Sequence, residues 1–517
     1  MRTRYPFFIA VALLGGLVVF LWQHSVTLTH GRFTYALDDA YIHLAMARQL
    51  ATHQVWGISP NEFSGVSSSL LWTALLSFFF FIFGDAEIAP FVLNILLGTL
   101  LLWVLDRLWS KVSLGAPWRL GLLALAFLAV PLASQPMIGM EVSLQCLLVA
   151  TFFYSIVLWS GVSDRTRDVI TLLLAFLLGA VRYECILLVE ITAFGFLLRG
   201  ETRRAVAIGL VGALPALIYG VFAMLEGGTF LPNTLFLKSG TVDAVMRKIP
   251  NAWQPMLFVG VSVIALFAIL ILLTRYVRKH FPNWRPSGTA IGFSATIVTA
   301  IAQFAIASPE QQFERYRAYV YIALLIWLGM FVGWLVNRPS TNSSRRYRIA
   351  AIVLLAGLST AHIPKFALYF SKTAIASKNI WDQQVQMARF VGRYCGGKPV
   401  VLVDIGAVSY YSNSPVIDLV GLGTDRIARM RLATGDPSDS MNDFIRKSHA
   451  RVAIIYPILR YRPDPDWIKK GSLVIEDRYV CARDTVDFYA LRVSDTEWLR
   501  SSLSDFRART TSKILIY

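Results

Sequence analysis

Two adjacent aspartates near the start of the chain have the residue types and the spacing that catalysis would need. Asp38 and Asp39 open the stretch Asp-Asp-Ala-Tyr-Ile-His-Leu-Ala-Met-Ala-Arg. Apolar residues recur at helical spacing between positions 42 and 50, so the pattern predicts an amphipathic helix that begins at about residue 39. Asp39 and His43 would then lie one turn apart on the same face of that helix.

This pair of carboxylates supports both a chemical and a structural interpretation. A carboxylate here could act as general base for a hydroxyl nucleophile, orient an acceptor, or help to hold a divalent cation. In the structural alternative, Asp38 is only the N-cap of the helix, and Asp39 only interacts favourably with the helix dipole. The local sequence does not decide between the two.

A second group of ionisable residues lies in or beside apolar stretches. Arg182 and Glu184 interrupt the apolar run 169–198, and Glu141 begins a helix shortly after Pro136. A guanidinium group matches phosphate oxygens in a bidentate manner, so Arg182 could hold a phosphate. The alternative is that Arg182 and Glu184 form an ion pair that caps a helical hairpin. Stabilisation by the helix dipole explains Glu141 as well as catalysis does.

Three more basic residues follow the same reasoning. Arg315 and Arg317, in Phe-Glu-Arg-Tyr-Arg, could bind phosphate or could belong to a belt of side chains that extend to a membrane surface. Lys238 could contact phosphate or could be an ordinary solvated lysine.

The composition indicates that membrane-spanning helices position these residues. Of the 517 residues, 56% are hydrophobic and only 16% are charged, which excludes a soluble enzyme of this length and a disordered or disulfide-scaffold protein. The net charge of +17 could suggest nucleic-acid binding, but the basic residues are spread over many short loops. Membrane topology requires such a spread, so we expect no nucleic-acid partner.

Apolar runs predict about eleven membrane spans, several of them shorter than the roughly 20 residues of a full crossing. The first run is interpreted as an uncleaved helix, because no signal-peptidase-like site follows it. The runs lie near 7–22, 88–105, 118–130, 142–159, 169–180, 185–198, 205–224, 255–274, 289–307, 318–336 and 349–368.

The basic residues of the loops predict the orientation. Alternate loops, with the amino terminus, carry 18 Lys and Arg residues, and the opposite set carries eight. The positive-inside rule makes the first set cytoplasmic, which puts the segment 23–87 and the tail outside the cytoplasm. The apolar segment 68–83 would invert this pattern if it were a span, so we expect a juxtamembrane or re-entrant helix on the outer face.

From about residue 371 the composition changes to that of a soluble α/β domain. The segments 400–403 and 451–456 are typical of buried strands, with turn residues between them. We therefore expect a membrane domain over 1–370 and an extracytoplasmic α/β domain over 371–517. Cys395 and Cys481 could form a disulfide in an oxidising compartment, whereas Cys146 and Cys185 lie within spans and are expected to pack. Asp404 and Asp418 follow strands, where either ligand binding or turn chemistry would explain them.

The ordered motifs resemble the GT-C superfamily of integral-membrane glycosyltransferases, in particular the branch of the terminal cell-wall arabinofuranosyltransferase. The stretch 38–48, Trp56-Gly57 and the stretch 61–73 carry the first part of the resemblance. Ser59-Pro60-Asn61-Glu62 departs from the Asn-Pro-Gly-Glu order of the family, and Arg182-Tyr183-Glu184 departs from Arg-Pro-Glu. The remaining matches are at Gly139–Glu141, Leu231–Thr234 with Lys238, Asp404–Ala407 and Val416–Leu422.

The resemblance implies a mostly α-helical polytopic membrane protein with a GT-C-like fold. It implies a hexosyl- or pentosyltransferase that moves a sugar from a polyprenyl-phosphate donor to a glycan, lipid or protein acceptor, on the outer face of a bacterial cytoplasmic membrane. Some members use a divalent cation such as Mg, Mn or Ca, and others do not, so no cofactor is assigned. The expected catalytic residues are Asp38 and Asp39, and the expected substrate-binding residues are His43, Glu141, Arg182, Glu184, Asn233, Lys238, Arg315 and Arg317.

Two other functions fit parts of the sequence. A transporter of lipid-linked sugars would have the spans, but it predicts inverted repeats and ionisable residues near the middle of the membrane, and the sequence has no such repeat. A non-catalytic receptor or assembly factor would keep the scaffold and use Asp38 and Asp39 only to cap a helix.

Overall fold

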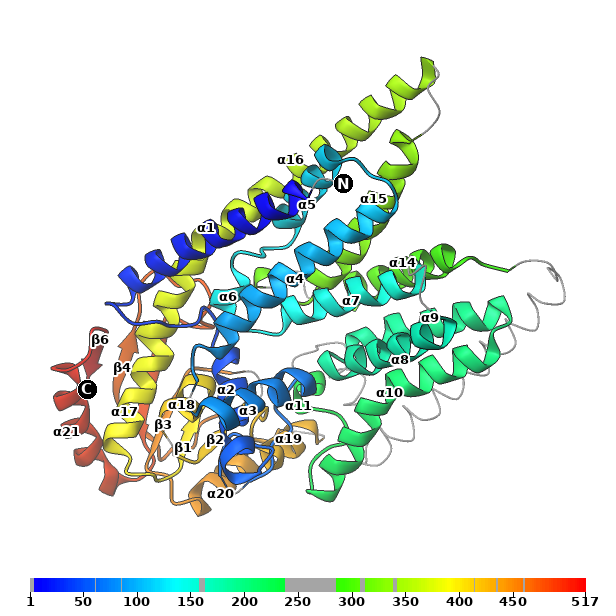
Figure 1. Ribbon diagram of the computed structural model, residues 1–517. Coiled ribbons are helices and arrows are strands. Elements are labelled where there is room, and N and C mark those ends of the chain that lie inside the picture. Colours follow the sequence, from blue (N-terminus) through cyan, green and yellow to red (C-terminus); the bar gives the residue numbers. More distant parts are fainter. Residues whose placement is uncertain are drawn as a thin grey trace.

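The computed structural model describes residues 4–517 with gaps at 61, 85, 158–162, 238–284, 307–311, 338–341, 413, 434–435 and 459–460. Lys238 and the span predicted at 255–274 lie outside the described residues. The described part consists of a bundle of apolar helices and a smaller domain with one β-sheet at the carboxyl end (Figure 1). This is the predicted arrangement of a mostly helical chain followed by an α/β domain.

Each apolar run predicted within the described residues forms a helix. The helices of the bundle are α1 (Tyr5–Leu28), α4 (Ala89–Lys111), α5 (Ala116–Ala129), α7 (Val142–Val157), α8 (Asp164–Val181), α9 (Glu184–Arg199), α10 (Thr202–Leu225), α14 (Gly288–Ile306), α15 (Ala318–Val336) and α16 (Asn342–Ile380). Short turns of helix lie between them: α6 (Gln135–Ile138), α11 (Asn233–Leu237) and η1 (Gln312–Glu314).

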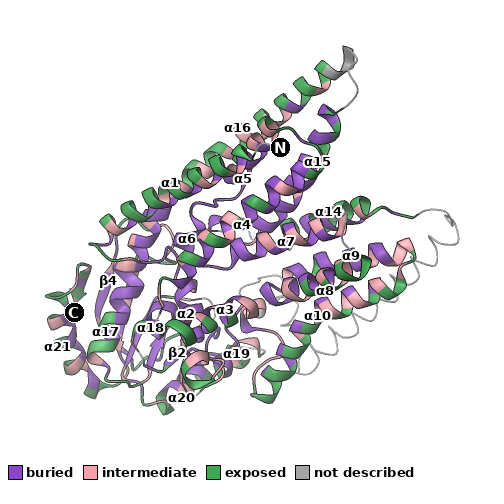
Figure 2. Ribbon diagram, viewed as in Figure 1, coloured by how far each residue is buried: buried purple, intermediate pink, exposed green. Residues whose placement is uncertain are grey.

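The lengths and the exposed surface of these helices identify a multi-pass membrane protein. Within the described residues, six helices are long and apolar enough to cross a membrane, namely α1, α4, α10, α14, α15 and α16. Large apolar side chains stay exposed along the outer helices, for example Phe8, Val221 and Val353 (Figure 2). Surface of this kind suits contact with hydrocarbon, since lipid tails are as apolar as the side chains. The predicted total of about eleven spans stays a prediction.

Helix α16 joins the two parts of the protein without a break. It runs for 39 residues, packs against α1, and passes residue 370, where we expected the membrane domain to end. It continues into the π-helical turn η2 (Trp381–Val385) and then α17 (Gln386–Tyr394). The change in composition near residue 371 therefore falls inside one long helix and not in a linker between domains.

The first loop forms two helices that pack on each other, α2 (Asp39–His53) and α3 (Leu70–Phe83). The Ser69 hydroxyl caps α3 by accepting a hydrogen bond from the backbone N–H of Trp72, at 3.2 Å. Helix α3 has 14 residues, and its tip leaves Phe81 and Phe83 exposed. The expectation that this segment is juxtamembrane or re-entrant stays a prediction.

The position of α2 corrects one expectation. The helix begins where the sequence predicts, but residues 40–47 have no exposed face, whereas an amphipathic helix would expose one to water. Residues 40–47 of α2 are all buried, because α3 covers one side of the helix and α18 (Gly406–Tyr411) of the tail domain covers the other (Figure 1). The polar side chains within residues 40–47, those of Tyr41 and His43, are therefore enclosed by protein.

The tail domain contains a six-stranded mixed sheet in the order β2-β1-β3-β5-β4-β6. Strands β1, β2 and β3 are parallel, and the remaining pairs are antiparallel. The predicted strands at 400–403 and 451–456 are β1 and β3. The bounds are β1 (Val400–Leu402), β2 (Val416–Asp418), β3 (Val452–Ile455), β4 (Ile468–Val474), β5 (Thr485–Ala490), β6 (Lys513–Ile516), α19 (Asp425–Leu432), α20 (Ser438–Lys447), η3 (Val493–Asp495) and α21 (Thr496–Arg507).

The four cysteines are buried, and none forms a disulfide. Cys395 and Cys481 are therefore separate thiols in this structure, and the disulfide considered between them is absent. Cys146 and Cys185 pack inside the helical bundle, as expected.

Candidate active site

The central contact of the candidate site is an ion pair between the first loop and the segment before α15. Arg315 Nη1 lies 2.5 Å from Asp39 Oδ2, although the two residues are 276 positions apart in the chain. Both side chains keep some exposure, 24% for Asp39 and 12% for Arg315. A carboxylate and a guanidinium group therefore meet where another molecule can reach them.

The backbone before Arg315 adopts an uncommon conformation. Phe313 and Glu314 both have left-handed φ angles, 57° and 53°, which is uncommon for residues other than glycine. Each such residue costs about 1–3 kcal/mol and persists where the surroundings fix it. Here Lys365 and Tyr369 of α16 bind the Glu314 carboxylate, at 2.5 Å and 3.1 Å. The long helix α16 thus holds the turn that presents Arg315.

Arg182 lies behind this ion pair and is held by two carboxylates. Its Nε and Nη2 donate to both oxygens of Glu184, at 3.1 Å and 2.8 Å, and its Nη1 donates to Glu141 at 2.5 Å. The ion pair considered between Arg182 and Glu184 is therefore present. All three guanidinium nitrogens donate to carboxylates, and Arg182 is 4% exposed, so its remaining N–H groups lie where a donor phosphate has little access.

The Tyr316 ring connects the two arginines. The guanidinium carbons of Arg182 and Arg315 lie 4.7 Å and 4.9 Å from its centroid, within the range of cation–π attraction. Tyr316 belongs to the motif Phe-Glu-Arg-Tyr-Arg, but the sequence analysis predicted no role for it. A tyrosine between two arginines of one motif is the signal that could have identified it.

His43 extends the same network away from the surface. Its Nδ1 is 3.0 Å from the Thr73 hydroxyl of α3, and its Nε2 is 4.0 Å from Glu141 Oε2. His43 and Glu141 are 3% and 0% exposed. Both were expected to bind substrate, but at this depth they contact protein groups and support Arg182. We name the set Asp39, His43, Glu141, Arg182, Glu184, Arg315 and Tyr316 the charged cluster.

Asp38 points away from the charged cluster and contacts the tail domain. Its carboxylate oxygens accept hydrogen bonds from the backbone N–H groups of Gly406 and Ala407, at 2.7 Å and 2.8 Å. Asp38 occupies the N-cap position of α2, as the structural alternative expected, but its side chain makes no capping hydrogen bond to its own helix. The two adjacent aspartates thus have different partners.

Burial, together with the nearby charge of Asp404, raises the pKa of Asp38 to about 7, against the lowering effect of the two backbone N–H groups. Asp404 follows β1 and accepts hydrogen bonds from Tyr456 at 2.9 Å and Gln384 at 2.8 Å. Two half-buried carboxylates therefore lie close together where the first loop meets the tail.

Asp418, the other aspartate at a strand end, is part of a turn. It accepts hydrogen bonds from the backbone N–H groups of Val420 and Gly423, both at 2.8 Å. Burial raises its pKa to about 6, which those N–H groups oppose. Of the two explanations considered for Asp418, ligand binding and turn chemistry, these contacts favour turn chemistry.

Asn233 and Arg317, two of the expected binding residues, contact groups that do not belong to the charged cluster. Asn233 donates to Asp425 of the tail at 2.5 Å, and its backbone N–H donates to Gly65. It therefore links the first loop, α11 and α19. Arg317 lies over the Phe304 ring of α14, with its guanidinium carbon 4.8 Å from the centroid. Lys238 lies outside the described residues.

The described residues do not offer an evident metal site. Within those ranges, no three His, Cys, Asp or Glu side chains are grouped so that they could hold a metal ion. The divalent cation that the resemblance suggests stays a prediction.

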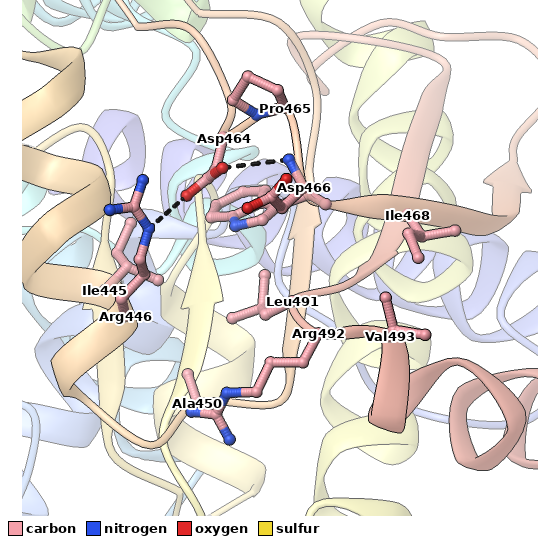
Figure 3. A pocket seen from close by; sticks show the side chains of 11 residues that line it. Ile445, Arg446, Ala450, Asp464, Pro465, Asp466, Ile468, Leu491, Arg492 and Val493 are labelled. Atoms are coloured by element: carbon pink, nitrogen blue, oxygen red, sulfur yellow. Dashed lines mark hydrogen bonds and ion pairs between the residues drawn. The ribbon is translucent and has the colours of Figure 1, made fainter.

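A cavity of about 700 Å³ lies on the tail domain, between α20, the start of β4 and the end of β5 (Figure 3). Asp464 in its wall accepts hydrogen bonds from Arg446 Nε at 2.7 Å and from the backbone N–H of Asp466 at 3.1 Å. Ala450, just before β3, also lines it, whereas Asp404 follows the opposite end of the parallel strand β1. The cavity therefore lies at the amino ends of the parallel strands, and Asp38 and Asp404 lie at their carboxyl ends.

Comparison with known proteins gives one family match and several similar structures. Residues 378–489 match a domain of unknown function, DUF8728. No curated protein matches the chain. ArnT from Cupriavidus metallidurans, in the apo state, is 14% identical over 94% of this chain and 98% of its own, with a TM-score of 0.48.

The same enzyme bound to undecaprenyl phosphate is 15% identical over the same shares, also with a TM-score of 0.48. An oligosaccharyltransferase from Archaeoglobus fulgidus, in complex with Zn and sulfate, is 13% identical over 85% of this chain and 67% of its own, with a TM-score of 0.43. These values are too low to indicate a shared activity.

Proposed function

We propose that the protein is a GT-C-type glycosyltransferase that moves a sugar from a polyprenyl-phosphate donor to an acceptor on the outer face of the cytoplasmic membrane. The observation that carries the proposal is the Asp39–Arg315 ion pair, a partly exposed carboxylate beside a partly exposed guanidinium group. It joins the first loop to the segment before α15, one of the apolar helices of the bundle. The ordered resemblance of the motifs to the GT-C superfamily supports the same reaction.

In the proposed reaction, Asp39 accepts the proton of an acceptor hydroxyl while that oxygen attacks the anomeric carbon of the donor sugar. A new glycosidic C–O bond forms, and the C–O bond to the phosphate breaks. The electron pair of that bond leaves with the polyprenyl phosphate. A carboxylate within hydrogen-bond distance of the hydroxyl contributes about 10²–10⁴-fold to such a step.

Arg315 is the better candidate for the donor phosphate. The Arg315 side chain is 12% exposed, whereas Arg182 is 4% exposed and every one of its guanidinium nitrogens already donates to a carboxylate. A guanidinium group aimed at the oxygen on which charge develops stabilises the transition state. The Tyr316 ring would then hold Arg315 in place, and Arg182 would strengthen the positive potential.

The finer parts of the proposal concern the substrate. The motif resemblance favours an arabinofuranosyl donor, and a glycan, lipid or protein of the cell envelope as acceptor. Charge counting supports a tail domain outside the cytoplasm. The contact between α2 and α18 agrees with it, since it requires the first loop and the tail to lie on the same side of the membrane.

Transfer by the purified full-length protein tests the function. The protein is incubated with a panel of polyprenyl-phosphate sugars, including the arabinofuranosyl donor, and with acceptor glycans, and released polyprenyl phosphate is measured. Release by the wild type that is lost in Asp39→Asn supports the proposal. Equal release by both proteins would overturn the role of Asp39. Absence of release from well-folded wild type, over the whole panel, would favour a transporter or a receptor.

A further inference from the structure

We propose that Asp38 is a positioning residue that fastens the tail domain to α2 and thereby holds Asp39 in place. The inference rests on the proposed role of Asp39 and changes the role predicted for Asp38. Asp38 would not exchange a proton with substrate. The tail domain would instead be a working part of the active site.

The first argument is how the Asp38 carboxylate is used. Both of its oxygens accept hydrogen bonds from consecutive backbone N–H groups, those of Gly406 and Ala407. Hydrogen bonds to an ionised acceptor are about twice as strong as those between neutral groups. An acceptor hydroxyl would have to compete with these two backbone N–H groups for the Asp38 carboxylate.

The second argument is how closely the two segments approach. A Cβ atom on Gly406 would lie 2.1 Å from the backbone oxygen of Asp38 and 2.8 Å from its Cγ. Real Cβ atoms do not come so close to a backbone oxygen, so only glycine fits. Gly406 thus allows the tail domain to contact the backbone of the first loop directly.

The third argument is that α2 is attached to α18 at both ends. Near its carboxyl end, Arg48 Nη2 donates to the Tyr410 carbonyl at 2.6 Å and stacks on the Tyr410 ring, 4.1 Å from its centroid. At its start, Asp38 holds Gly406 and Ala407. Two attachments along one helix fix both its position and its rotation, and Asp39 is the first residue of that helix.

As a consequence, the contact between the tail domain and α2 controls the position of the Asp39 carboxylate. Asp38 and Asp39 are neighbours in the chain, so a shift of Asp38 away from Gly406 rotates the start of α2. That rotation would separate the Asp39–Arg315 pair. A displacement of about 1 Å in a catalytic group can cost 10²-fold in rate.

The experiment compares four single variants of the full-length protein, and the Gly406→Ala/Asp38→Asn double variant, by two independent readouts. Gly406→Ala introduces the steric clash, and Asp38→Asn removes the charge and replaces one acceptor oxygen with a donor. Asp39→Asn is the catalytic comparator. Gly392→Ala is the matched control, because its new Cβ would meet only ordinary contacts, the nearest at 3.6 Å. Hydrogen–deuterium exchange follows 35–48 and 400–411, and kcat and KM are measured with the active donor.

We expect Gly406→Ala and Asp38→Asn to raise exchange in both segments, to leave β5 protected, and to lower kcat at least tenfold with little change in KM. Their effects on kcat should not add in the double variant, since both act through one contact. Asp39→Asn should lower kcat without raising exchange, and Gly392→Ala should behave as wild type.

Two results would overturn the inference. Unchanged exchange in Asp38→Asn would mean that Asp38 does not fasten the domain, and raised exchange with full kcat would mean that the contact does not position Asp39. Asp38→Asn also decides the matter if Gly406→Ala does not fold. If wild type transfers no sugar, the proposed function fails and with it the positioning role, while the exchange data still report whether Asp38 fastens the tail.

Discussion

Arg315 Nη1 lies 2.5 Å from Asp39 Oδ2, and this ion pair joins the segment before α15 to the first turn of α2. It leaves both side chains partly exposed, whereas His43, Glu141 and Arg182 behind them are buried. The exposed pair, and not the buried residues, is therefore where we expect chemistry.

The first prediction concerns Asp39. Asp39→Asn keeps the shape of the side chain but removes its charge and basicity, so kcat should fall by about 10²–10⁴-fold, the usual contribution of a general base. Steady-state transfer from the active donor measures the change. Asp164→Asn is the matched control, because Asp164 also lies in the first turn of a helix and pairs with an arginine, and it is exposed. Comparable losses in the two variants would contradict a specific role for Asp39.

The second prediction concerns Arg315. Arg315→Lys keeps the positive charge but loses the planar fork that binds two phosphate oxygens, so kcat should fall by about 10²-fold. Arg317→Lys should retain most activity, since Arg317 stacks on Phe304. Transfer rates of the two lysine variants provide the test. A larger loss in Arg317→Lys would reverse the assignment of the phosphate contact.

The sequence predicted the elements of the site better than their partners. The start of α2 at Asp39 and the strands at 400–403 and 451–456 follow from local periodicity, so they could be predicted. The burial of α2 could not, because it depends on α18, which is more than 350 positions away in the chain and has no amphipathic pattern pointing to α2.

The individual roles of the site residues depend equally on distant contacts. Asp38 and Asp39 have the same residue type and adjacent positions, yet one contacts Gly406 and the other contacts Arg315. Only the tertiary fold distinguishes them. Arg182 and Glu184, two positions apart, form the ion pair that their spacing allowed.

The third prediction concerns the buried support of Arg182. Glu141→Gln removes one of the two carboxylates that balance this buried arginine, and removal of one partner from a buried ion pair costs about 3 kcal/mol. The melting temperature in detergent should therefore fall, and intrinsic fluorescence of the tryptophans can follow it. Asp164→Asn, whose partner Arg167 is solvated, should leave the melting temperature unchanged. An unaltered melting temperature in Glu141→Gln would show that Glu184 alone balances the charge.

The fourth prediction concerns the pH dependence of stability. The pKa of Asp38 is raised from 3.8 in its ordinary form to about 7 in the fold, first by burial and then by Asp404. Between about pH 5 and pH 7 the folded protein keeps this proton while the unfolded chain has lost it. This group therefore favours folding at low pH, and its contribution falls as the pH rises, by up to about 1.4 kcal/mol per pH unit.

Asp38→Asn cannot titrate and should lack that part of the slope. Melting temperatures of the wild type and the variant from pH 5 to pH 8 measure the difference, and Asp164→Asn should keep the slope of the wild type. Parallel curves for wild type and Asp38→Asn would contradict the shifted pKa. The titratable groups that interact with Asp38 are Asp39, Tyr41, Asp404, Tyr456 and Cys481.

The fifth prediction concerns the orientation of the protein in the membrane. The four native cysteines are buried, so a membrane-impermeant maleimide should label the wild type weakly. Val493→Cys introduces a thiol at a position of the tail domain that is 75% exposed, and Arg203→Cys introduces one at an exposed position in the first turn of α10. If basic loops face the cytoplasm, intact cells should label Val493→Cys, and Arg203→Cys should react only after permeabilisation. The opposite labelling pattern would put the tail and the charged cluster in the cytoplasm, where a polyprenyl-phosphate sugar presented on the outer face could not reach them.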